Sequence, residues 1–154
     1  MPIARLERSL QLPQEYVWDW LADFAALEML HPPGNLTEFS CEGNFLGARR
    51  YARFNPTFGI NEQVIERLDV VCKPHVLVYS LVETNPLPMS DYVAVVNLNK
   101  SLENSTAITW EGHYTQGDLS SEEMSGMLCR FYSLFLDGID QAYKSGLRPG
   151  ERLY

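Results

Sequence analysis

Two charged side chains in the middle of the sequence have the types and spacing needed to act together on a bound molecule. Arg50 and Glu66 lie in two segments expected to be neighbouring strands, so their side chains can pair across those strands. If the pair faces an interior space, Arg50 could orient a carbonyl or carboxylate of a ligand. Burying either charge alone would be costly, which favours mutual pairing. A structural or solvent-facing ion pair is the simpler interpretation, and the sequence leaves both open.

Tyrosine and histidine side chains supply further polar groups. Tyr79, Tyr92 and Tyr114 each combine an apolar ring with a hydroxyl that could fix a ligand oxygen or polarise a carbonyl as a general acid would. Each is equally consistent with a core tyrosine whose hydroxyl reaches the rim. His31 follows the second expected helix, where a neutral imidazole could act as a base or hydrogen-bond donor, or simply cap that helix. These are candidate polar groups, and the sequence assigns no catalytic residue.

The chain lacks the sequence motifs of several common classes of enzyme. It has no G-x-S-x-G, P-loop, G-x-G-x-x-G or H-E-x-x-H motif, which argues against a hydrolase, an NTPase, a dehydrogenase and a zinc protease. The 3 cysteines (Cys41, Cys72 and Cys129) are far apart without metal-ligand spacing, and the 3 histidines are scattered. We therefore expect no metal and no cofactor. The odd cysteine count favours a reducing, cytoplasmic location.

Length and charge restrict the partners. The 154 residues fit a single domain over residues 1–154. Against 20 Asp plus Glu there are only 12 Lys plus Arg, a net charge of −8, which argues against nucleic acid and an anionic membrane surface. No apolar run approaches the ~20 residues of a membrane span, and the N-terminus has no signal-peptide pattern. A homodimer is left open.

Helix signals lie near both ends of the chain. After a strand expected over Ile3–Leu12, Pro13 opens a first helix, and a second short helix is expected over Ala25–Leu30. Ser120 and Glu123 form a capping box that begins a C-terminal helix of about 24 residues. The apolar stripe of this long helix consists of Met124, Met127, Leu128, Phe131, Phe135, Ile139 and Ala142.

Between these helices the sequence predicts almost only strands. Segments rich in β-branched and aromatic residues are separated by turn clusters, such as Glu42-Gly43-Asn44 and Asn85-Pro86-Leu87-Pro88. The short connections favour antiparallel neighbours, because parallel strands need long crossovers. With the first strand, a seven-stranded twisted sheet would curl round the long helix and leave space between the two. The six further strands are expected at Leu36–Glu42, Ala48–Phe54, Asn61–Val71, Val76–Glu83, Tyr92–Leu102 and Thr106–Thr115.

Motifs spread over about residues 3–145 resemble one known superfamily. In chain order they are Val17-Trp18 with Asp23-Phe24, His31-Pro32, Gly47-Ala48-Arg49-Arg50, Glu66-Arg67-Leu68 with Tyr79, Pro86-Leu87-Pro88 with Tyr92, and Ser105-Thr106 with Thr109-Trp110. Their order and spacing are similar to those of the SRPBCC superfamily, also called START-like or helix-grip, and most of all to its polyketide cyclase/dehydratase-like bacterial branch. Two segments depart from the pattern: Asn55 to Asn61, and the tail Gly150 to Tyr154.

This resemblance implies an α+β helix-grip fold, with two short helices between the first and second strands and a curved antiparallel sheet that grips the C-terminal helix around an apolar cavity. Strand alternation and the helix stripe indicate which side chains face that cavity. The predicted ligand-binding residues are Trp18, His31, Arg50, Phe54, Glu66, Tyr79, Tyr92, Trp110, Tyr114, Phe131, Tyr132 and Phe135. For any single aromatic residue among them, ordinary core packing remains the alternative.

Three functions are compatible with such a protein. The first is the binding of a small hydrophobic or aromatic, lipid- or polyketide-like molecule in the cavity. The second is a polyketide cyclase/dehydratase-like enzyme that uses cavity Tyr, Arg and Glu groups, which requires a convergent polar cluster. The third is a protein-interaction module, which requires a contiguous exposed apolar patch.

Overall fold

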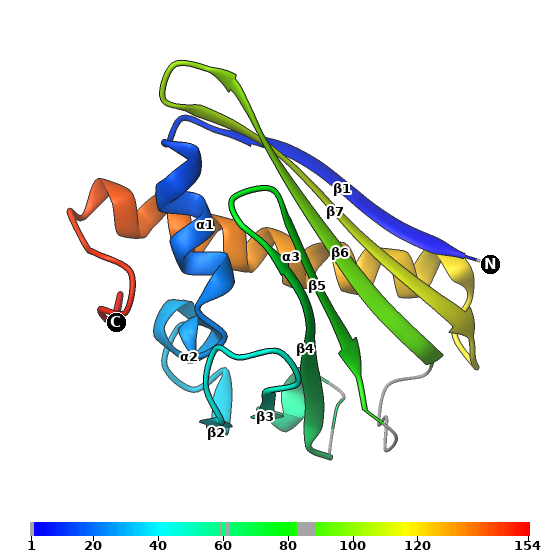
Figure 1. Ribbon diagram of the computed structural model, residues 1–154. Helices are drawn as coiled ribbons and strands as arrows, with labels where there is room; N and C mark the ends of the chain where they lie inside the picture. The colour runs from blue at the N-terminus through cyan, green and yellow to red at the C-terminus, as the bar shows by residue number, and fades with distance from the viewer. Residues whose placement is uncertain (1, 59, 61, 83–88) are drawn as a thin grey trace.

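A computed structural model shows a curved antiparallel sheet with one long helix lying along its inner side (Figure 1). The structure describes residues 2–58, 60, 62–82 and 89–154. In chain order the elements are β1 (Ile3–Leu10), α1 (Gln14–Ala22), α2 (Ala26–Leu30), β2 (Leu36–Cys41), β3 (Arg49–Phe54), the 3-10 helix η1 (Pro56–Phe58), β4 (Val64–Cys72), β5 (Val76–Leu81), β6 (Met89–Leu102), β7 (Ser105–Gln116) and α3 (Ser121–Lys144).

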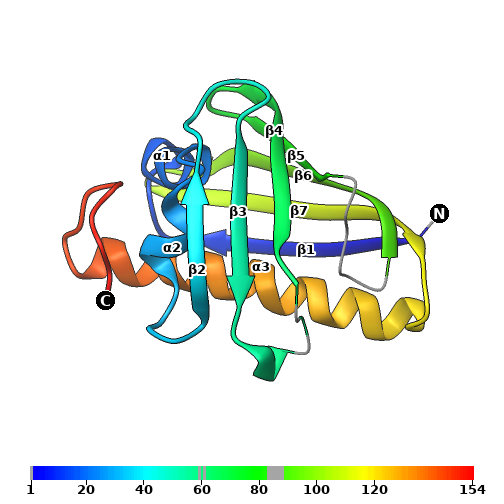
Figure 2. The same cartoon turned by 90° about the horizontal axis from the view of Figure 1, so that it is seen from below.

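The seven strands follow the order β1-β7-β6-β5-β4-β3-β2, and every neighbouring pair is antiparallel. The sheet curves so strongly that β2 and β3 run across the direction of β1 and β7 (Figure 2). Register shifts between Leu68 and Val70 in β4, and between Ser90 and Val93 in β6, add local bends of the kind that bulges produce. The predicted fold, with two short helices between β1 and β2, is confirmed.

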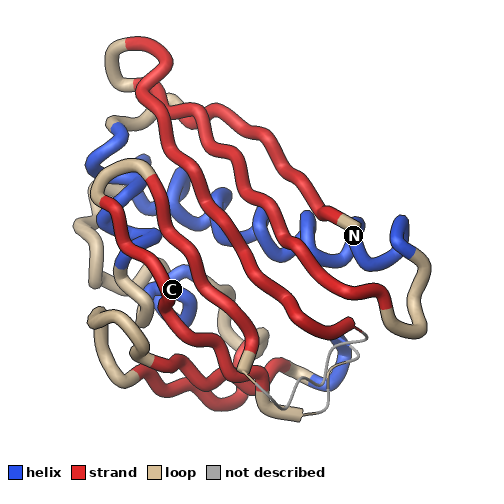
Figure 3. Tube along the Cα trace, turned by 45° about the vertical axis from the view of Figure 1, so that its right-hand side comes forward, coloured by secondary structure: helices blue, strands red, loops and turns tan. Residues whose placement is uncertain are grey.

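Helix α3 forms as its sequence predicts. The Ser120 hydroxyl accepts a hydrogen bond from the backbone N–H of Glu123 at 3.1 Å, and the Glu123 carboxylate accepts one from the Ser120 N–H at 3.0 Å. This capping box satisfies two N–H groups that the first turn would otherwise leave unpaired. The helix then lies along one face of the sheet (Figure 3). Its buried side chains include Met124, Leu128, Leu136 and Ile139, and they form the core with the sheet and α1.

The first strand is shorter than expected. It ends at Leu10 rather than Leu12, because the chain turns before α1. The carbonyl of Leu12 accepts a hydrogen bond from the Thr106 hydroxyl at 2.8 Å, which holds the connection against β7. Pro13 occupies the N-cap position, one residue before the helix that it was expected to open.

Two strands also begin away from their expected positions. Strand β4 begins at Val64 rather than Asn61, since residues 56–58 form η1. Strand β6 begins at Met89, before the expected Tyr92. Strand β5 ends at Leu81, so Val82 lies outside the strand that was expected to continue to Glu83. Residues Asn61 and Glu83 themselves, and the turn at residues 85–88, lie outside the described residues. The remaining expected strand ends differ from the observed ones by at most one residue.

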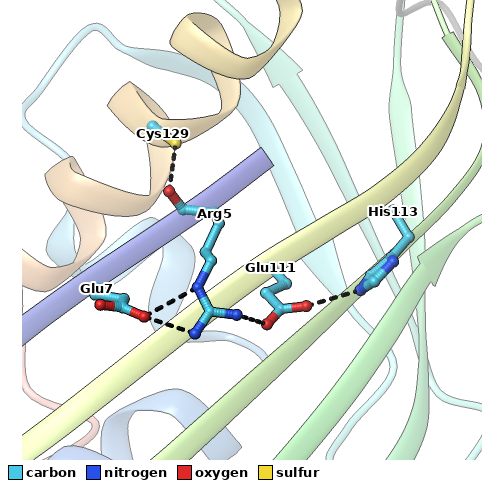
Figure 4. A network of polar contacts seen from close by, with 5 residues as sticks. All are labelled: Arg5, Glu7, Glu111, His113 and Cys129. Atoms are coloured by element: carbon cyan, nitrogen blue, oxygen red, sulfur yellow. Dashed lines mark hydrogen bonds and ion pairs between the residues drawn. The ribbon is translucent and has the colours of Figure 1, made fainter. Parts of the chain in front are cut away.

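A network of polar side chains joins β1 and β7 on the outer face of the sheet, and a thiol of α3 contacts the β1 backbone from the inner side (Figure 4). Arg5 is paired with Glu7 at 2.6 Å and also with Glu111, its partner across the β1–β7 ladder. His113 Nε2 lies 3.1 Å from Glu111, and the Cys129 thiol donates to the Arg5 carbonyl at 3.6 Å. His113 is therefore on the side of the sheet away from the core, as its position relative to Trp110 predicts.

Candidate functional site

A cavity of about 80 Å³ lies between the sheet and α3. A single water needs about 10–15 Å³ of such space, whereas drug-sized ligands occupy pockets of about 300–1,000 Å³. The space is therefore larger than a site for one water and smaller than a pocket for a drug-sized ligand. Its lining consists of Leu27, His31, Arg50, Phe54, Ile60, Val64, Glu66, Tyr79, Leu81, Tyr92, Trp110, Met127, Leu128, Phe131, Tyr132 and Phe135.

Most of the wall is apolar and aromatic, and it comes from both layers of the fold. The Trp110 ring on β7 stacks on the Tyr132 ring of α3 with centroids 4.6 Å apart and planes at 9°. Phe135 meets the edge of Trp110 at 5.9 Å, and Phe54 lies 5.4 Å from Phe131. Such ring pairs add stabilisation beyond their buried area. They join the sheet to α3 through aromatic contacts and leave a largely apolar wall around the cavity.

Arg50 and Glu66 form the charged part of the lining. They are direct partners across the β3–β4 ladder, and Arg50 Nε lies 2.9 Å from Glu66 Oε1. The guanidinium also lies over the Phe24 ring at 4.1 Å and over the Tyr79 ring at 5.1 Å. Although burial opposes its charge, the adjacent Glu66 carboxylate raises the pKa of Arg50. The predicted pairing is confirmed, and the pair faces the cavity rather than solvent.

His31 brings an unpaired polar group into the lining. It is only 6% exposed, and in the described part of the chain its Nδ1 atom has no hydrogen-bond partner. Burial, and then the positive charge of Arg50, lowers the pKa of His31 to about 4, so the imidazole is neutral near pH 7. His31 also terminates α2 as its C-cap residue.

The position of His31 depends on a close approach between helices. A Cβ atom at Gly138 of α3 would lie 2.9 Å from the Cβ of Leu30, the last residue of α2. Only glycine therefore lets α2 pack this closely, and His31 follows directly. The chain leaves the helix there because Pro32 and Pro33 cannot continue it.

Two tyrosine hydroxyls join the sheet to the helix across the interior. Tyr92 on β6 and Tyr132 on α3 have their oxygens 2.5 Å apart, and burial is the main cause that raises the pKa of both. Gly112 makes room for this pair, because a Cβ there would lie 2.3 Å from the Tyr132 hydroxyl and 2.8 Å from the Tyr92 ring. Burial likewise raises the pKa of Tyr79. All three phenols thus stay protonated at neutral pH.

The structure brings all but two of the predicted site residues together around the cavity. Trp18 on α1 is 2% exposed but does not line it, because it packs within the core instead. Tyr114 also lies outside the lining, since its hydroxyl donates at 3.3 Å to the Ser121 carbonyl at the start of α3. For Tyr114 the alternative of a core tyrosine is the correct one.

Six lining residues lie outside the predicted ligand-binding set: Leu27, Ile60, Val64, Leu81, Met127 and Leu128. Strand alternation relates Val64 to Glu66 and Leu81 to Tyr79, and Leu128 belongs to the predicted stripe of α3. Leu27 lies one helical turn before His31 on α2, and this i, i+4 spacing was a usable signal. Met127 belongs to the predicted apolar stripe of α3, at the margin that faces the cavity. Ile60 lies in the irregular segment before β4, where no periodicity indicates direction.

Two other kinds of feature, a metal site and a membrane-spanning helix, are not found among the described residues. Among residues 2–58, 60, 62–82 and 89–154, no group of three His, Cys, Asp or Glu side chains is arranged to hold a metal ion. Within the same residues, every helix is too short or too polar to cross a membrane.

A curved sheet that grips a long helix around an internal cavity defines a helix-grip protein. The profile of the family described as "Polyketide cyclase / dehydrase and lipid transport" matches residues 1–144. The chain therefore belongs to this family, as the sequence resemblance predicts. A comparison with curated proteins gives no match.

Solved structures of similar fold come from several organisms. An uncharacterised protein from Bacillus thuringiensis is 23% identical, with a TM-score of 0.71 over 92% of this chain and 98% of its own. A Thermobifida fusca protein is 19% identical, with a TM-score of 0.74 over 100% and 99%. Norcoclaurine synthase from Thalictrum flavum, in complex with dopamine and hydroxybenzaldehyde, is 14% identical, with a TM-score of 0.75 over 93% and 86%. At these identities the likeness establishes the fold alone.

Proposed function

We propose that this protein binds a small hydrophobic or aromatic molecule in the cavity between the sheet and α3. The observation that carries the proposal is the cavity itself, an 80 Å³ space with a mostly aromatic wall and a few polar atoms directed into it. That combination is typical of small-molecule sites, where apolar walls supply affinity and polar groups fix orientation. A fully packed core would leave no such space.

The family and one structural relative support the same conclusion. The family description names polyketide chemistry and lipid transport, both of which concern hydrophobic molecules. The related norcoclaurine synthase structure contains two single-ring aromatic compounds, dopamine and hydroxybenzaldehyde. A single ring also suits the size of the present cavity better than an extended lipid does.

Native mass spectrometry of the protein purified from its own host tests this proposal. We expect a co-purifying small molecule that Leu81→Trp displaces, because Leu81 is a half-buried lining residue and a larger side chain there fills the cavity. Leu102→Trp is the matched control, since Leu102 is 73% exposed at the end of β6 and away from the cavity. Equal ligand occupancy in both variants would contradict the proposal.

A second candidate function is catalysis of the cyclase or dehydratase kind. It is favoured by the convergence of Arg50, Glu66 and the neutral His31 on the cavity, because an enzyme needs a polar cluster of this sort. Arg50 could stabilise negative charge that develops on a carbonyl oxygen, and His31 could accept a proton.

Two variants separate a binder from an enzyme. With the co-purifying molecule in hand, Tyr92→Phe and Arg50→Ala should reduce turnover more than affinity if the protein is an enzyme, and affinity alone if it is a binder. Mass spectrometry of the molecule before and after incubation with the protein gives the turnover. An unchanged molecule in the presence of the native protein would eliminate the enzyme.

The third candidate, a protein-interaction module, has less support. The exposed large apolar residues that the structure describes are distributed over β1, the β2–β3 loop, β4, β6, α3 and the C-terminal tail. An interaction surface would require them to form one contiguous patch.

A further inference from the structure

We infer that the ligand of this cavity is an uncharged single-ring aromatic molecule with a hydroxyl or amide group that hydrogen-bonds to the Arg50–Glu66 pair, rather than a carboxylate or a pure hydrocarbon. This inference rests on the proposed binding function and adds the chemical class of the ligand. It follows from three properties of the lining: its charge balance, its unused polar atoms and its size.

The charge on Arg50 is already balanced. Its side chain is 8% exposed and that of Glu66 is 13% exposed, so their attraction at 2.9 Å acts largely out of water. Among the described residues of the lining, Arg50 and Glu66 are the only charged ones, and His31 adds no charge because its imidazole is neutral near pH 7. The described lining thus presents no net positive charge to an anionic ligand.

A carboxylate ligand would consequently be disfavoured. It would bring a second negative charge next to Glu66 with only one arginine to serve both. Burying an ionised carboxylate without its own partner is unfavourable in proteins. A neutral ligand avoids this cost.

A pure hydrocarbon is disfavoured for a different reason. The hydrogen bonds of Glu66 involve only Oε1, and those of Arg50 involve Nε and, at 3.5 Å, Nη1 to the Phe24 carbonyl. In the part of the chain that the structure describes, the hydrogen bonds of this pair leave Arg50 Nη2 and Glu66 Oε2 unused, and two buried lining atoms, His31 Nδ1 and Trp110 Nε1, have no partner. A hydrocarbon would displace water from these atoms and replace none of its hydrogen bonds.

A ligand hydroxyl or amide matches these atoms. Arg50 Nη2 can donate to a ligand oxygen, whereas Glu66 Oε2 can accept from a ligand O–H or N–H. Neutral His31 offers one further donor or acceptor, according to its tautomer. Both a donor and an acceptor on the ligand are therefore served at once, and only a neutral polar group offers both.

The size of the cavity limits the rest of the ligand. Its volume of about 80 Å³ lies below the about 150 Å³ of a cavity known to hold benzene in another protein, so even one ring requires small shifts of the wall. The half-buried lining side chains of Leu81, Met127 and Phe131 are the ones best able to make them. A second ring would need a much larger rearrangement.

Two isosteric probe pairs test the inference on the native protein. Phenol and toluene differ by a hydroxyl against a methyl group, and benzamide and benzoate differ mainly in charge. At pH 7, titrations followed by amide chemical shifts should give phenol and benzamide each about tenfold tighter binding than its partner, as expected for about 1.4 kcal/mol from hydrogen bonds and charge.

Each possible result has a distinct meaning. If none of the four probes binds, the proposed function itself fails. If toluene equals phenol, or benzoate equals or exceeds benzamide, the cavity binds small rings but the inferred ligand class is wrong. The expected order supports both.

A charge-neutralising substitution sharpens the test. Glu66→Gln frees the charge on Arg50 and should reverse the benzamide–benzoate preference. Glu38→Gln is the control, because Glu38 on β2 pairs with Arg53 of β3 on the outer face of the sheet. This substitution should leave all four affinities unchanged. An unreversed preference in a folded Glu66→Gln protein would overturn the inference. If this variant does not fold, the two probe pairs on the native protein still decide the matter.

Discussion

Two of the three arginines in strand β3, Arg50 and Arg53, are each paired with a glutamate on a neighbouring strand. The Arg50–Glu66 pair is 2.9 Å long with side chains 8% and 13% exposed, whereas the Arg53–Glu38 pair is 3.3 Å long with side chains 41% and 67% exposed. The two pairs have the same chemistry and share a strand, yet they lie on opposite faces of the sheet. The comparison teaches that the face of the sheet, rather than the residue types, makes one pair part of the cavity lining.

The largest expected difference concerns the loss of one partner. Glu66→Ala leaves the buried guanidinium of Arg50 uncompensated, which should lower the free energy of unfolding by about 3–5 kcal/mol. Urea denaturation followed by circular dichroism measures this change. A loss below about 1 kcal/mol would place the inner pair in the same class as exposed pairs.

His31 is a buried titratable group beside the inner pair, and the pH dependence of protein stability tests its environment. Its pKa of about 4 in the folded protein lies below the ordinary 6.5, so the unfolded chain binds the additional proton between these values. The folded protein with neutral His31 therefore keeps its full stability above pH 6.5. That stability decreases as the pH falls from 6.5 towards 4, because the unfolded chain takes up a proton that the folded protein does not. Between pH 7.5 and 4.5 the native protein should lose about 2–3 kcal/mol more than His31→Gln does. Parallel curves for the two proteins in chemical denaturation would show that His31 titrates normally.

Two glycines, one at a buried position of the sheet and one at an exposed position of α3, allow the space available for an added methyl group to be compared. Gly112→Ala pushes a methyl group against the Tyr92–Tyr132 pair and should destabilise the protein by about 1–3 kcal/mol. Gly126 on the exposed side of α3 has no atom within 4 Å of an added Cβ, so Gly126→Ala should be neutral or stabilising by up to about 1 kcal/mol. Thermal denaturation of both variants measures the difference, and equal effects would mean that Gly112 is not a packing constraint.

The smallest effect is expected for the outer pair itself. Glu38→Ala should change the unfolding free energy by less than about 1 kcal/mol, because water and salt screen exposed pairs. Added salt should reduce this effect further, whereas it should alter the effect of Glu66→Ala little. Denaturation at low and high salt checks this contrast, and a large salt-resistant effect of Glu38→Ala would contradict it.

Local patterns in the sequence predict most of the fold. The capping box at Ser120 and the apolar stripe of α3 are fixed by neighbouring residues, and alternation along β7 places Trp110 inside and His113 outside. The Arg50–Glu66 pairing is also predictable, since it needs only the register of two consecutive strands.

Features that depend on contacts between elements distant in the sequence could not be predicted from local patterns. Tyr92 and Tyr132 meet only because Gly112 leaves room for both, and three separate elements make that contact. Tyr114 shares its strand face with Trp110 but lies near the start of α3, where its hydroxyl has a partner. Periodicity gives the face of a strand, whereas the position along the strand decides whether a side chain reaches the cavity.

The central claim is that the space between the sheet and α3 is a binding site, and a phenol titration monitored by two-dimensional ¹H–¹⁵N NMR tests it most directly. We predict saturable shifts concentrated at lining residues such as Arg50, Tyr79, Trp110 and Phe131, with the outer residues Glu38 and His113 unaffected. Shifts that are absent, or that are centred on the outer face of the sheet, would contradict the account.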